Sequence, residues 1–336
     1  MKILIIRRDN IGDLVCTTPL IRSLRRQLPD AKIEVLATRY NRAVLENNPD
    51  IDALHAYTKA KHRMPDESLL SIYWQRITTI WKLRRARFDV ALIPGDVSTS
   101  ALRFAHWIAP RRIVTQMISA QNGNHEVERC CHLLDQLGLA YEAPAPLVVA
   151  KPTLTTELRS KHCLPEDTPI IGFHISARKP SQRWPAEHFA NLIQRIHNIA
   201  PDTAFMLLWA PGSTNNPQHP GDDEKAEAIL SKVKSFPVFP VPTHQLEELI
   251  AALSLCNTVI CADGGAMHLA AGLGKPIVAL FGQSDTARWH PWGVPHAVLQ
   301  TPCQDVADID IDKVIYALAE TQQLKPNRTQ GSVAAT

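Results

Sequence analysis

Short apolar runs alternate with amphipathic stretches through the first half of the chain. The runs predict strands at residues 2–7, 32–38, 52–57, 90–95 and 111–114, because a short apolar run bounded by polar or turn residues is typical of a buried strand. The stretch after the first run spaces its apolar residues three and four positions apart, which predicts a helix with one buried face. The residues of that face are Ile11, Leu14, Val15, Thr18, Ile21, Leu24 and Leu28.

The same alternation begins again after a proline-rich segment near the middle of the chain. Pro144, Pro146 and Pro152 stand within residues 141–156, and because prolines interrupt regular structure we expect an interdomain linker there. Strands are then expected at 169–176, 204–209, 238–241, 258–262 and 277–281, and helices at 186–199, 222–234, 245–255, 266–273 and 311–323. Strands that alternate with helices form parallel sheets with right-handed crossovers.

This pattern predicts an α/β protein of two Rossmann-like domains whose parallel sheets face a central cleft. The 336 residues exceed one ordinary core, since single domains are typically about 100–200 residues long. We expect an N-terminal domain at 1–150, a C-terminal domain at 151–324, and a disordered polar tail at 325–336 that has no apolar face. Ligands of such folds bind beyond the carboxyl ends of the strands, so the residues that directly follow strands are the first candidates for function.

Composition narrows the class of protein. Hydrophobic residues make up 45% and charged residues 21%, as in ordinary globular proteins. No apolar run approaches the roughly 20 residues that a membrane-spanning helix needs, and the opening apolar run is a strand rather than an export signal. The seven cysteines are odd in number and include no Cys-x-x-Cys pair, which predicts reduced thiols, no zinc site and a cytoplasmic location.

The basic residues gather in the first half although the net charge is only +3. That net charge does not indicate binding to nucleic acid. The run from Lys82 to Arg87 is interpreted as a solvated helix end, where cations suit the helix dipole. The cluster of Lys59, Lys61 and Arg63 is the better candidate for attracting an anionic acceptor or a membrane surface.

The first strand is followed by a candidate catalytic carboxylate. Residues 8–13 lack the Gly-x-Gly-x-x-Gly spacing of a dinucleotide site, which disfavours a nicotinamide cofactor. Gly12 would let a substrate approach the backbone closely. Asp13 is interpreted either as a general base that takes a proton from an acceptor hydroxyl or as a helix-terminal carboxylate stabilised by the dipole. The residues alone leave both interpretations open.

A second candidate site follows the predicted strand 258–262. Gly264 and Gly265 stand between this strand and a helix, where free backbone N–H groups and the helix dipole make a site for a pyrophosphate without a metal. Asp263 would cap the helix or orient the loop. His268 lies about one turn inside the helix, where it would either donate to phosphate or be a satisfied core histidine.

A third segment follows the first strand of the second half. Ser176 offers a hydroxyl, and Arg178, Lys179 and Arg183 offer cations that would offset the charge developing on a departing nucleoside diphosphate. The alternative interpretation is a basic surface loop that Trp184 anchors in the core.

Together these segments resemble glycosyltransferase family 9, the lipopolysaccharide heptosyltransferases, over nearly the whole chain. The motifs that carry the resemblance are Ile11-Gly12-Asp13, Arg183-Trp184-Pro185, the run from Asp263 to Ala271, Gly274-Lys275-Pro276 and Phe281-Gly282. The resemblance implies a GT-B fold and a metal-independent transfer, with inversion and without a cofactor, from ADP-heptose to a Kdo- or heptose-bearing lipid acceptor. Because the acceptor is a lipid, the resemblance also leads to the hypothesis that the protein contacts the cytoplasmic face of the inner membrane peripherally.

The resemblance also assigns roles to residues. Asp13 matches the family's catalytic base, Ser176, Gln182 and Arg183 match its phosphate-contacting residues, and residues 263–268 match its donor-phosphate loop. The loop that contains Lys59, Lys61 and Arg63 resembles the region that meets acidic groups of the inner core, and Gly12 is expected on the acceptor side because of the close backbone approach that it permits. Two positions depart from the family: Gly264 stands where many members have Ser or Thr, and Gln182 stands where members often have Lys.

Two other functions remain as alternatives at this level. A nucleotide-sugar epimerase of similar two-domain shape would use Asp13 for a different proton transfer and would need no acceptor. A nucleotide-sugar-binding protein without catalysis would act as a scaffold, and the presence of Asp13 argues against it. Product analysis separates the transferase from both.

Overall fold

The structure is a computed structural model that describes residues 1–59, 68–96, 99–116, 124–164, 166–215 and 220–323. The tail 325–336 and the predicted acceptor-site residues Lys61 and Arg63 lie outside these residues.

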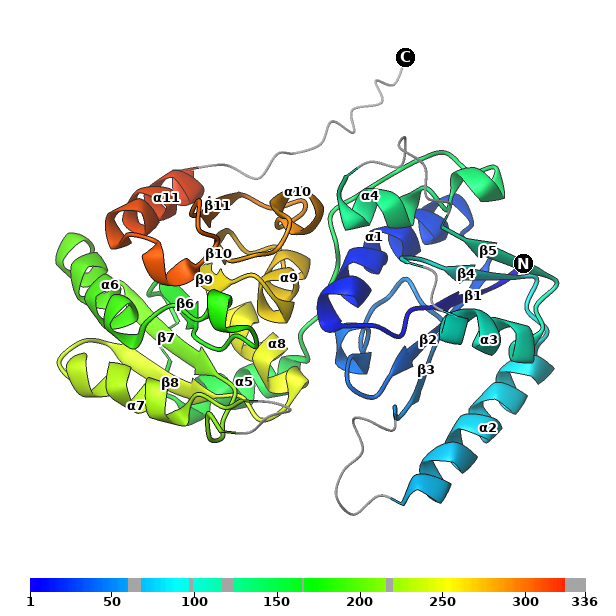
Figure 1. The fold of residues 1–336 in the computed structure, drawn as a ribbon, viewed down its shortest axis with the longest axis horizontal. Coiled ribbons are helices and arrows are strands. Elements are labelled where there is room, and N and C mark those ends of the chain that lie inside the picture. Colours follow the sequence, from blue (N-terminus) through cyan, green and yellow to red (C-terminus); the bar gives the residue numbers. More distant parts are fainter. Residues whose placement is uncertain (60–67, 97–98, 117–123, 165, 216–219, 324–336) are drawn as a thin grey trace.

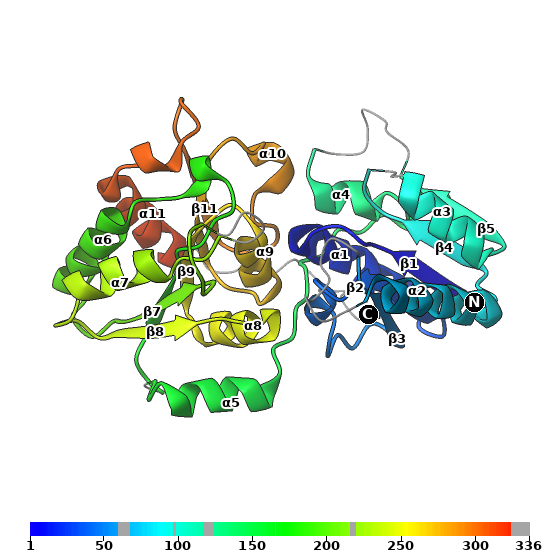
Figure 2. The ribbon, with the colours of Figure 1, turned by 60° about the horizontal axis from the view of Figure 1, so that its bottom comes forward.

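Two parallel β-sheets form the framework, one in each half of the chain (Figures 1 and 2). The N-terminal sheet has the strand order β3-β2-β1-β4-β5, with strands β1 (Lys2–Ile6), β2 (Lys32–Thr38), β3 (Ala53–Tyr57), β4 (Val90–Ile93) and β5 (Arg112–Thr115). The C-terminal sheet has the order β11-β10-β9-β6-β7-β8, with strands β6 (Ile170–His174), β7 (Ala204–Trp209), β8 (Val238–Pro242), β9 (Thr258–Ala262), β10 (Ile277–Phe281) and β11 (His296–Gln300). These orders confirm the predicted pair of Rossmann-like sheets.

Helices flank both sheets. The helices of the first half are α1 (Ile11–Gln27), α2 (Leu69–Ala86), α3 (Thr99–Ile108) and α4 (Glu126–Cys131). Those of the second half are α5 (Pro152–Lys161), α6 (Ala186–Ile199), α7 (Asp223–Lys232), α8 (Leu246–Leu255), α9 (Gly265–Gly272), α10 (Thr286–Trp289) and α11 (Ile311–Gln323). None of the helices within the described ranges is both long and apolar enough to cross a membrane.

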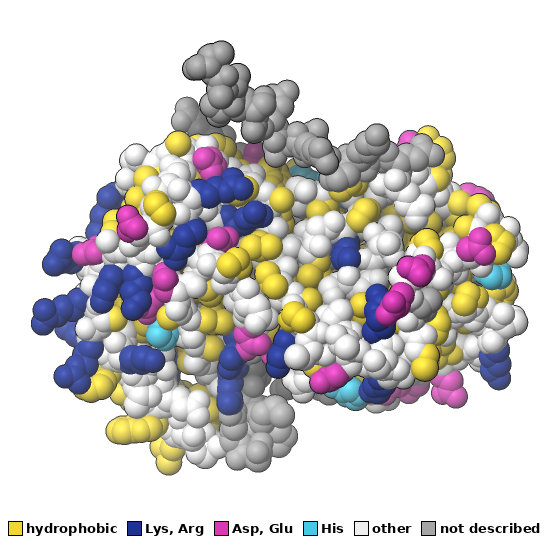
Figure 3. Space-filling model, turned by 180° about the vertical axis from the view of Figure 1, so that it is seen from behind, with side chains coloured by type: hydrophobic (Ala, Val, Ile, Leu, Met, Phe, Trp, Pro, Cys, Tyr) yellow, Lys and Arg dark blue, Asp and Glu magenta, His cyan; other side chains and the backbone are white. Residues whose placement is uncertain are grey.

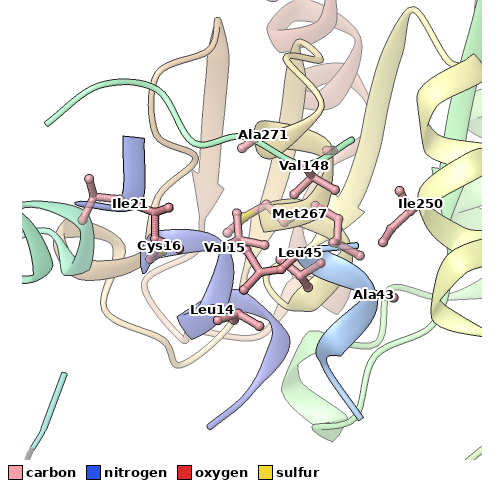
Figure 4. Packing of buried hydrophobic residues seen from close by; sticks show 14 of the residues in the cluster. Leu14, Val15, Cys16, Ile21, Ala43, Leu45, Val148, Ile250, Met267 and Ala271 are labelled. Carbon is pink, nitrogen blue, oxygen red and sulfur yellow. The ribbon is translucent and has the colours of Figure 1, made fainter. Parts of the chain in front are cut away.

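The two halves share one hydrophobic core across their junction. Val15 of α1 and Leu45 lie beside Met267 of α9 (Figure 4), and all of these side chains are at most 1% exposed. The helices α1 and α9 pack on each other. The start of α1 follows β1 and the start of α9 follows β9, so this packing sets the first turns of the two helices against each other.

The linker is shorter than the prolines predict. Residues 138–151 contain no helix or strand, and Val148 N donates to Gly272 O at 2.8 Å. The expectation that the linker continues to residue 156 is wrong, because α5 begins at Pro152. Proline is accepted at the first helical position, where its missing N–H has no intrahelical partner to lose and its φ is already helical.

Candidate active site

A cleft of about 420 Å³ lies between the two halves at the carboxyl ends of their strands. Its floor is formed by the first turn of α1 and by the segments that follow β6 and β9, the strands on either side of the point where the strand order reverses. Open α/β sheets bind ligands at such a point. Predicted site residues that line the cleft are Gly12, Asp13, Ser176, Gln182, Asp263, Gly264, Gly265 and His268.

Asp13 lines the cleft and also stabilises the start of α1. Its Oδ2 accepts from the backbone N of Asn10 at 3.0 Å and from Asn10 Nδ2 at 2.9 Å, which forms a capping box. Its Oδ1 accepts from Arg7 Nη2 at 2.7 Å. Burial raises the pKa of Asp13, but the Arg7 guanidinium and the Asn10 hydrogen bonds outweigh burial and lower it below the usual 3.8. The carboxylate of this cleft-lining residue is therefore ionised at neutral pH.

Arg7 connects Asp13 to a fully buried glutamate. The Arg7 side chain is 2% exposed and Glu126 is 0% exposed, and Arg7 Nη2 donates to Glu126 Oε1 at 2.8 Å. The second oxygen of Glu126 accepts from Arg288 Nη2 at 2.8 Å. Since Arg288 lies in α10 of the other half, this network of charges joins the two domains beside the cleft.

The sequence held no signal for this network. Glu126 and Arg288 are 162 positions apart in the chain, and neither belongs to a short motif. Asp96, which follows β4, also accepts from Arg288 at 3.1 Å and from Arg129 at 2.9 Å. Joint variation of these positions among homologous sequences is the kind of sequence evidence that could reveal these ion pairs.

The glycine loop after β9 presents backbone to the cleft. No side-chain hydrogen bond caps α9, so its first N–H groups have neither a side-chain nor an intrahelical acceptor. A Cβ on Gly264 would meet no atom within 4 Å, whereas one on Gly265 would lie 3.3 Å from Ile11 Cβ. The backbone at Gly264 is therefore open to a ligand, and the helix start is a ready site for an anion.

Gln182 holds Asp263 at the base of this loop. Gln182 Nε2 donates to Asp263 Oδ2 at 2.9 Å and lies 3.4 Å from Ser284 Oγ. Both Gln182 and Asp263 are buried. This hydrogen bond ties Asp263 to the segment that follows β6, and the orientation of the loop by Asp263 stays a prediction.

His268 lies at the contact between the two halves. It is 5% exposed, its ring packs edge-on against Trp289, and its Nδ1 is 3.7 Å from Cys16 Sγ. A Cβ on Gly12 would lie 2.5 Å from its Cδ2, so glycine is required there for α1 to approach the ring. Burial lowers the pKa of His268 despite the opposing effects of Asp263 and Asp13. The imidazole is therefore neutral at neutral pH.

The predicted residues after β6 separate into two groups. Ser176 Oγ accepts from Ala210 N at 2.9 Å and keeps its proton for another acceptor, while Arg178 and Lys179 are exposed and line the cleft. Arg183 is not among the lining residues. Its guanidinium pairs with the buried Asp222 and donates to Ala177 O at 3.2 Å. In this arrangement Arg183 stabilises the segment that follows β6 and does not line the cleft.

The acceptor side is only partly described. Lys59 is partly buried and is not among the residues that line the cleft. Tyr40, which sequence reasoning missed, lines the cleft beside the N-terminal domain's site residues. Arg178 of the other domain lines the same cleft, and burial raises the pKa of Tyr40 against the opposing field of Arg178.

No group of three or more His, Cys, Asp or Glu side chains in the described part of the chain is arranged to hold a metal ion.

His174, at the end of β6, has its pKa lowered to about 4 by burial and by Lys225, so it stays uncharged beside the cleft at neutral pH.

Two facing Rossmann-like sheets with a glycine-rich helix start in the cleft between them define the GT-B class of glycosyltransferases. Within that class, the chain belongs to glycosyltransferase family 9 (heptosyltransferase), whose family model matches residues 81–314.

Individual relatives agree with this assignment. Lipopolysaccharide heptosyltransferase 2 of Salmonella typhimurium is 26% identical over 304 residues, which cover 84% of this chain and 83% of the relative. The solved family 9 glycosyltransferase of Veillonella parvula has a TM-score of 0.80 at 21% identity, covering 95% of this chain and 96% of that one. Escherichia coli ADP-heptose lps heptosyltransferase II has a TM-score of 0.77 at 21% identity, covering 96% and 99%. These two structures establish the shared fold.

Proposed function

We propose that this glycosyltransferase moves a heptose from ADP-heptose to the inner core of lipopolysaccharide, with inversion at the anomeric carbon and without a metal ion. The relatives' names supply the sugar and the acceptor class. The observation that carries the proposal is the pairing in one cleft of an ionised carboxylate, Asp13, with the open glycine loop at the start of α9.

In the proposed reaction the donor diphosphate binds the N–H groups of Gly264 and Gly265, where the helix dipole favours negative charge. Asp13 takes the proton of an acceptor hydroxyl, whose oxygen forms a bond to the anomeric carbon as the bond from that carbon to the diphosphate breaks. The ADP leaves with both electrons of that bond. Lys179 and Arg178 at the cleft wall stabilise its charge, and a neutral His268 donates to a phosphate oxygen.

A single displacement of this kind inverts the anomeric centre because attack and departure occur on opposite faces of the sugar. The cations and the helix dipole balance the charge of the leaving diphosphate, a task that a metal ion performs in other sites. Gly12 and the loop of Lys59, Lys61 and Arg63 are proposed to meet the acceptor. Because that acceptor is anchored by its lipid, the protein associates peripherally with the cytoplasmic face of the inner membrane.

Purified protein incubated with ADP-heptose and deep-rough lipopolysaccharide, with and without EDTA, tests the proposal. We expect ADP release and an acceptor mass increase of one heptose, neither of them sensitive to EDTA. Absence of transfer to every such acceptor contradicts the proposed donor or acceptor, and loss of activity in EDTA contradicts metal independence.

The same assay addresses the alternatives. An epimerase would isomerise the nucleotide sugar without an acceptor, and a binding protein would release no ADP at all. The match to the family model favours the transferase.

A further inference from the structure

Helix α2 carries a second apolar stripe on the face turned away from the protein. Its inward face, which includes Ile72 and Leu83, is buried, and Leu83 belongs to a cluster with Tyr57 and Phe104. The outward side chains and their exposed fractions are Leu70 (83%), Trp74 (68%), Ile77 (57%) and Trp81 (58%). Their i, i+4, i+7, i+11 spacing places them on one helical face. We call these residues the outer stripe.

Packing within the domain does not account for the outer stripe. In Figure 1, α2 lies along the outer edge of the N-terminal domain, away from the other half. The elements with which α2 makes its main packing contacts are α3 and β3, and the side chains that α2 buries are Ile72 and Leu83 of the inward face. Contiguous exposed apolar and aromatic side chains of this kind mark a surface that meets another body.

Cations gather around the C-terminal end of the outer stripe. Helix α2 contains no acidic residue and ends with Arg84 and Arg85 in its last turn. Other exposed cations close to it in the chain or on neighbouring elements are Lys82, Arg87, Arg103, Arg111 and Arg112. Seen from behind, Lys and Arg side chains gather along the edge of the molecule that belongs to the N-terminal domain (Figure 3). Of these cations, Arg111 pairs with Asp89 at 3.2 Å.

This combination identifies the chemistry of the partner. Tryptophans beside aliphatic side chains prefer the headgroup layer of a bilayer, where the ring is buried and the indole N–H stays wet. Arginine and lysine next to them bind lipid phosphates, and Arg85 lies over the Trp81 ring at 4.3 Å from its centroid. A second copy of the chain fits poorly, because a two-fold interface would set these cations against their own copies.

We propose that α2 docks the protein on the surface of an anionic phospholipid bilayer, with the outer stripe in the headgroup layer and the flanking cations on lipid phosphates. The inference deepens the proposed function, on which it rests for the lipid-linked acceptor. It assigns the membrane contact to α2, a helix that contains none of the predicted site residues.

Sedimentation with vesicles tests this assignment without donor or acceptor. We expect the protein to sediment with phosphatidylcholine vesicles that contain phosphatidylglycerol, to do so less as salt rises, and to bind pure phosphatidylcholine weakly. The double variant Trp74→Gln/Trp81→Gln should bind at least roughly tenfold more weakly, since each buried aromatic side chain contributes to partitioning. The variant Lys82→Glu/Arg85→Glu should lose the salt-sensitive part of binding.

The matched control is Ile199→Gln/Tyr316→Gln. These residues are 69% and 67% exposed on helices of the other half, and their replacement should leave vesicle binding unchanged. All substituted residues are at the surface, so unchanged thermal unfolding is expected and is measured alongside. Equal binding by the double Trp variant and the wild type overturns the proposal. So does failure of the wild type to bind at low salt, or a concentration-dependent dimer in vesicle-free solution that the Trp substitutions abolish.

Activity separates this inference from the proposed function. On a soluble, deacylated acceptor the double Trp variant should match the wild type, whereas on acceptor embedded in anionic vesicles it should be slower. A wild type that binds vesicles but transfers no heptose to either acceptor would contradict the proposed function and leave the docking surface supported. Equal rates of both proteins on embedded acceptor would contradict the docking role of α2.

Discussion

The two walls of the cleft present charge to a ligand in different ways. The N-terminal wall holds Asp13 in a chain of buried ion pairs through Arg7 and Glu126. The C-terminal wall offers the backbone N–H groups around Gly264 and Gly265, which no side chain caps. The first wall satisfies its own charges before any ligand arrives, whereas the second leaves its dipoles for the ligand to satisfy. Substitutions in the first wall should therefore affect catalysis and stability, and those in the second should affect donor binding.

Asp13→Asn should have the largest effect on catalysis. Removing a general base typically costs about 10²- to 10⁴-fold in rate, so we expect kcat to fall within that range. Donor affinity, measured by calorimetry with ADP, should change little because the donor loop belongs to the opposite wall. Asp9→Asn is the matched control, since Asp9 also pairs with Arg7, at 3.3 Å, but is 45% exposed. If Asp13→Asn kept near-normal kcat, the carboxylate would act only as a helix cap.

Glu126→Gln should show that the N-terminal wall contributes to stability. Breaking a buried ion pair by removing one partner costs about 3–5 kcal/mol, and Glu126 is fully buried between Arg7 and Arg288. We expect the free energy of unfolding to fall by about 3 kcal/mol or more in urea titrations. Asp312→Asn breaks the exposed pair with Arg195 and should leave the midpoint unchanged. Equal effects of the two substitutions would show that the buried network carries no special stability.

The contact between the walls should make stability depend on pH through His125. Burial and the neighbouring histidines lower the pKa of His125 to about 3, although His290 O partly opposes them. Its Nδ1 accepts from Val127 N at 3.1 Å and its Nε2 donates to His290 O at 2.8 Å, so the neutral ring satisfies both partners. The unfolded chain therefore binds a proton that the folded protein does not between about pH 6.5 and the folded value of about 3.

Stability is thus complete above the unfolded pKa and falls as the pH drops below it. Each pH unit in this window should cost about 1.4 kcal/mol from His125 alone. Urea unfolding at about pH 7.5 and about pH 5.5 measures the slope, which should be shallower in His125→Gln. The variant His244→Gln changes an exposed histidine and serves as the control. An identical slope in His125→Gln and the wild type would assign the pH dependence to other groups.

The contrast between the walls also explains what the sequence could predict. The apolar run of β1 and the periodic face of α1 reflect local burial, and the glycine pair before α9 is a contiguous motif, so the strands, the parallel sheets and the position of the glycine loop in the cleft could be predicted. The pairing of Glu126 with Arg288 depends on tertiary packing and has no local pattern. For the same reason the sequence showed the charge of Arg183 but not its pairing with Asp222.

The remaining differences have similar causes. Pro152 has the same identity as the prolines of the linker but stands at the first position of α5, and only the residues after it distinguish a helix start from a break. The strand β11 was not predicted because its burial is only partial, which weakens the hydrophobic pattern. Which roles the lining residues have in catalysis stays a prediction that the substitutions above test.

Gly264→Ser should have the smallest effect, and in the favourable direction. A Cβ at this position meets no atom within 4 Å, and the backbone φ of 162° is extended, which any residue adopts. A serine hydroxyl placed there would donate to the donor phosphate, and a partly solvated hydrogen bond of this kind is worth a fraction of a kcal/mol to about 1.5 kcal/mol. We therefore expect the dissociation constant for ADP to fall roughly threefold in calorimetry.

Two controls separate the hydroxyl from the added carbon at this position. Gly264→Ala adds only the methyl group and should leave ADP binding unchanged. Gly12→Ala, on the other wall, would place its Cβ 2.5 Å from the His268 ring and should weaken activity by disturbing the packing of α1 on α9. If Gly264→Ser bound ADP more weakly than Gly264→Ala, the hydroxyl would be capping α9 instead, taking an N–H group that the donor needs. That result would show that the C-terminal wall binds the donor because its helix start is left uncapped.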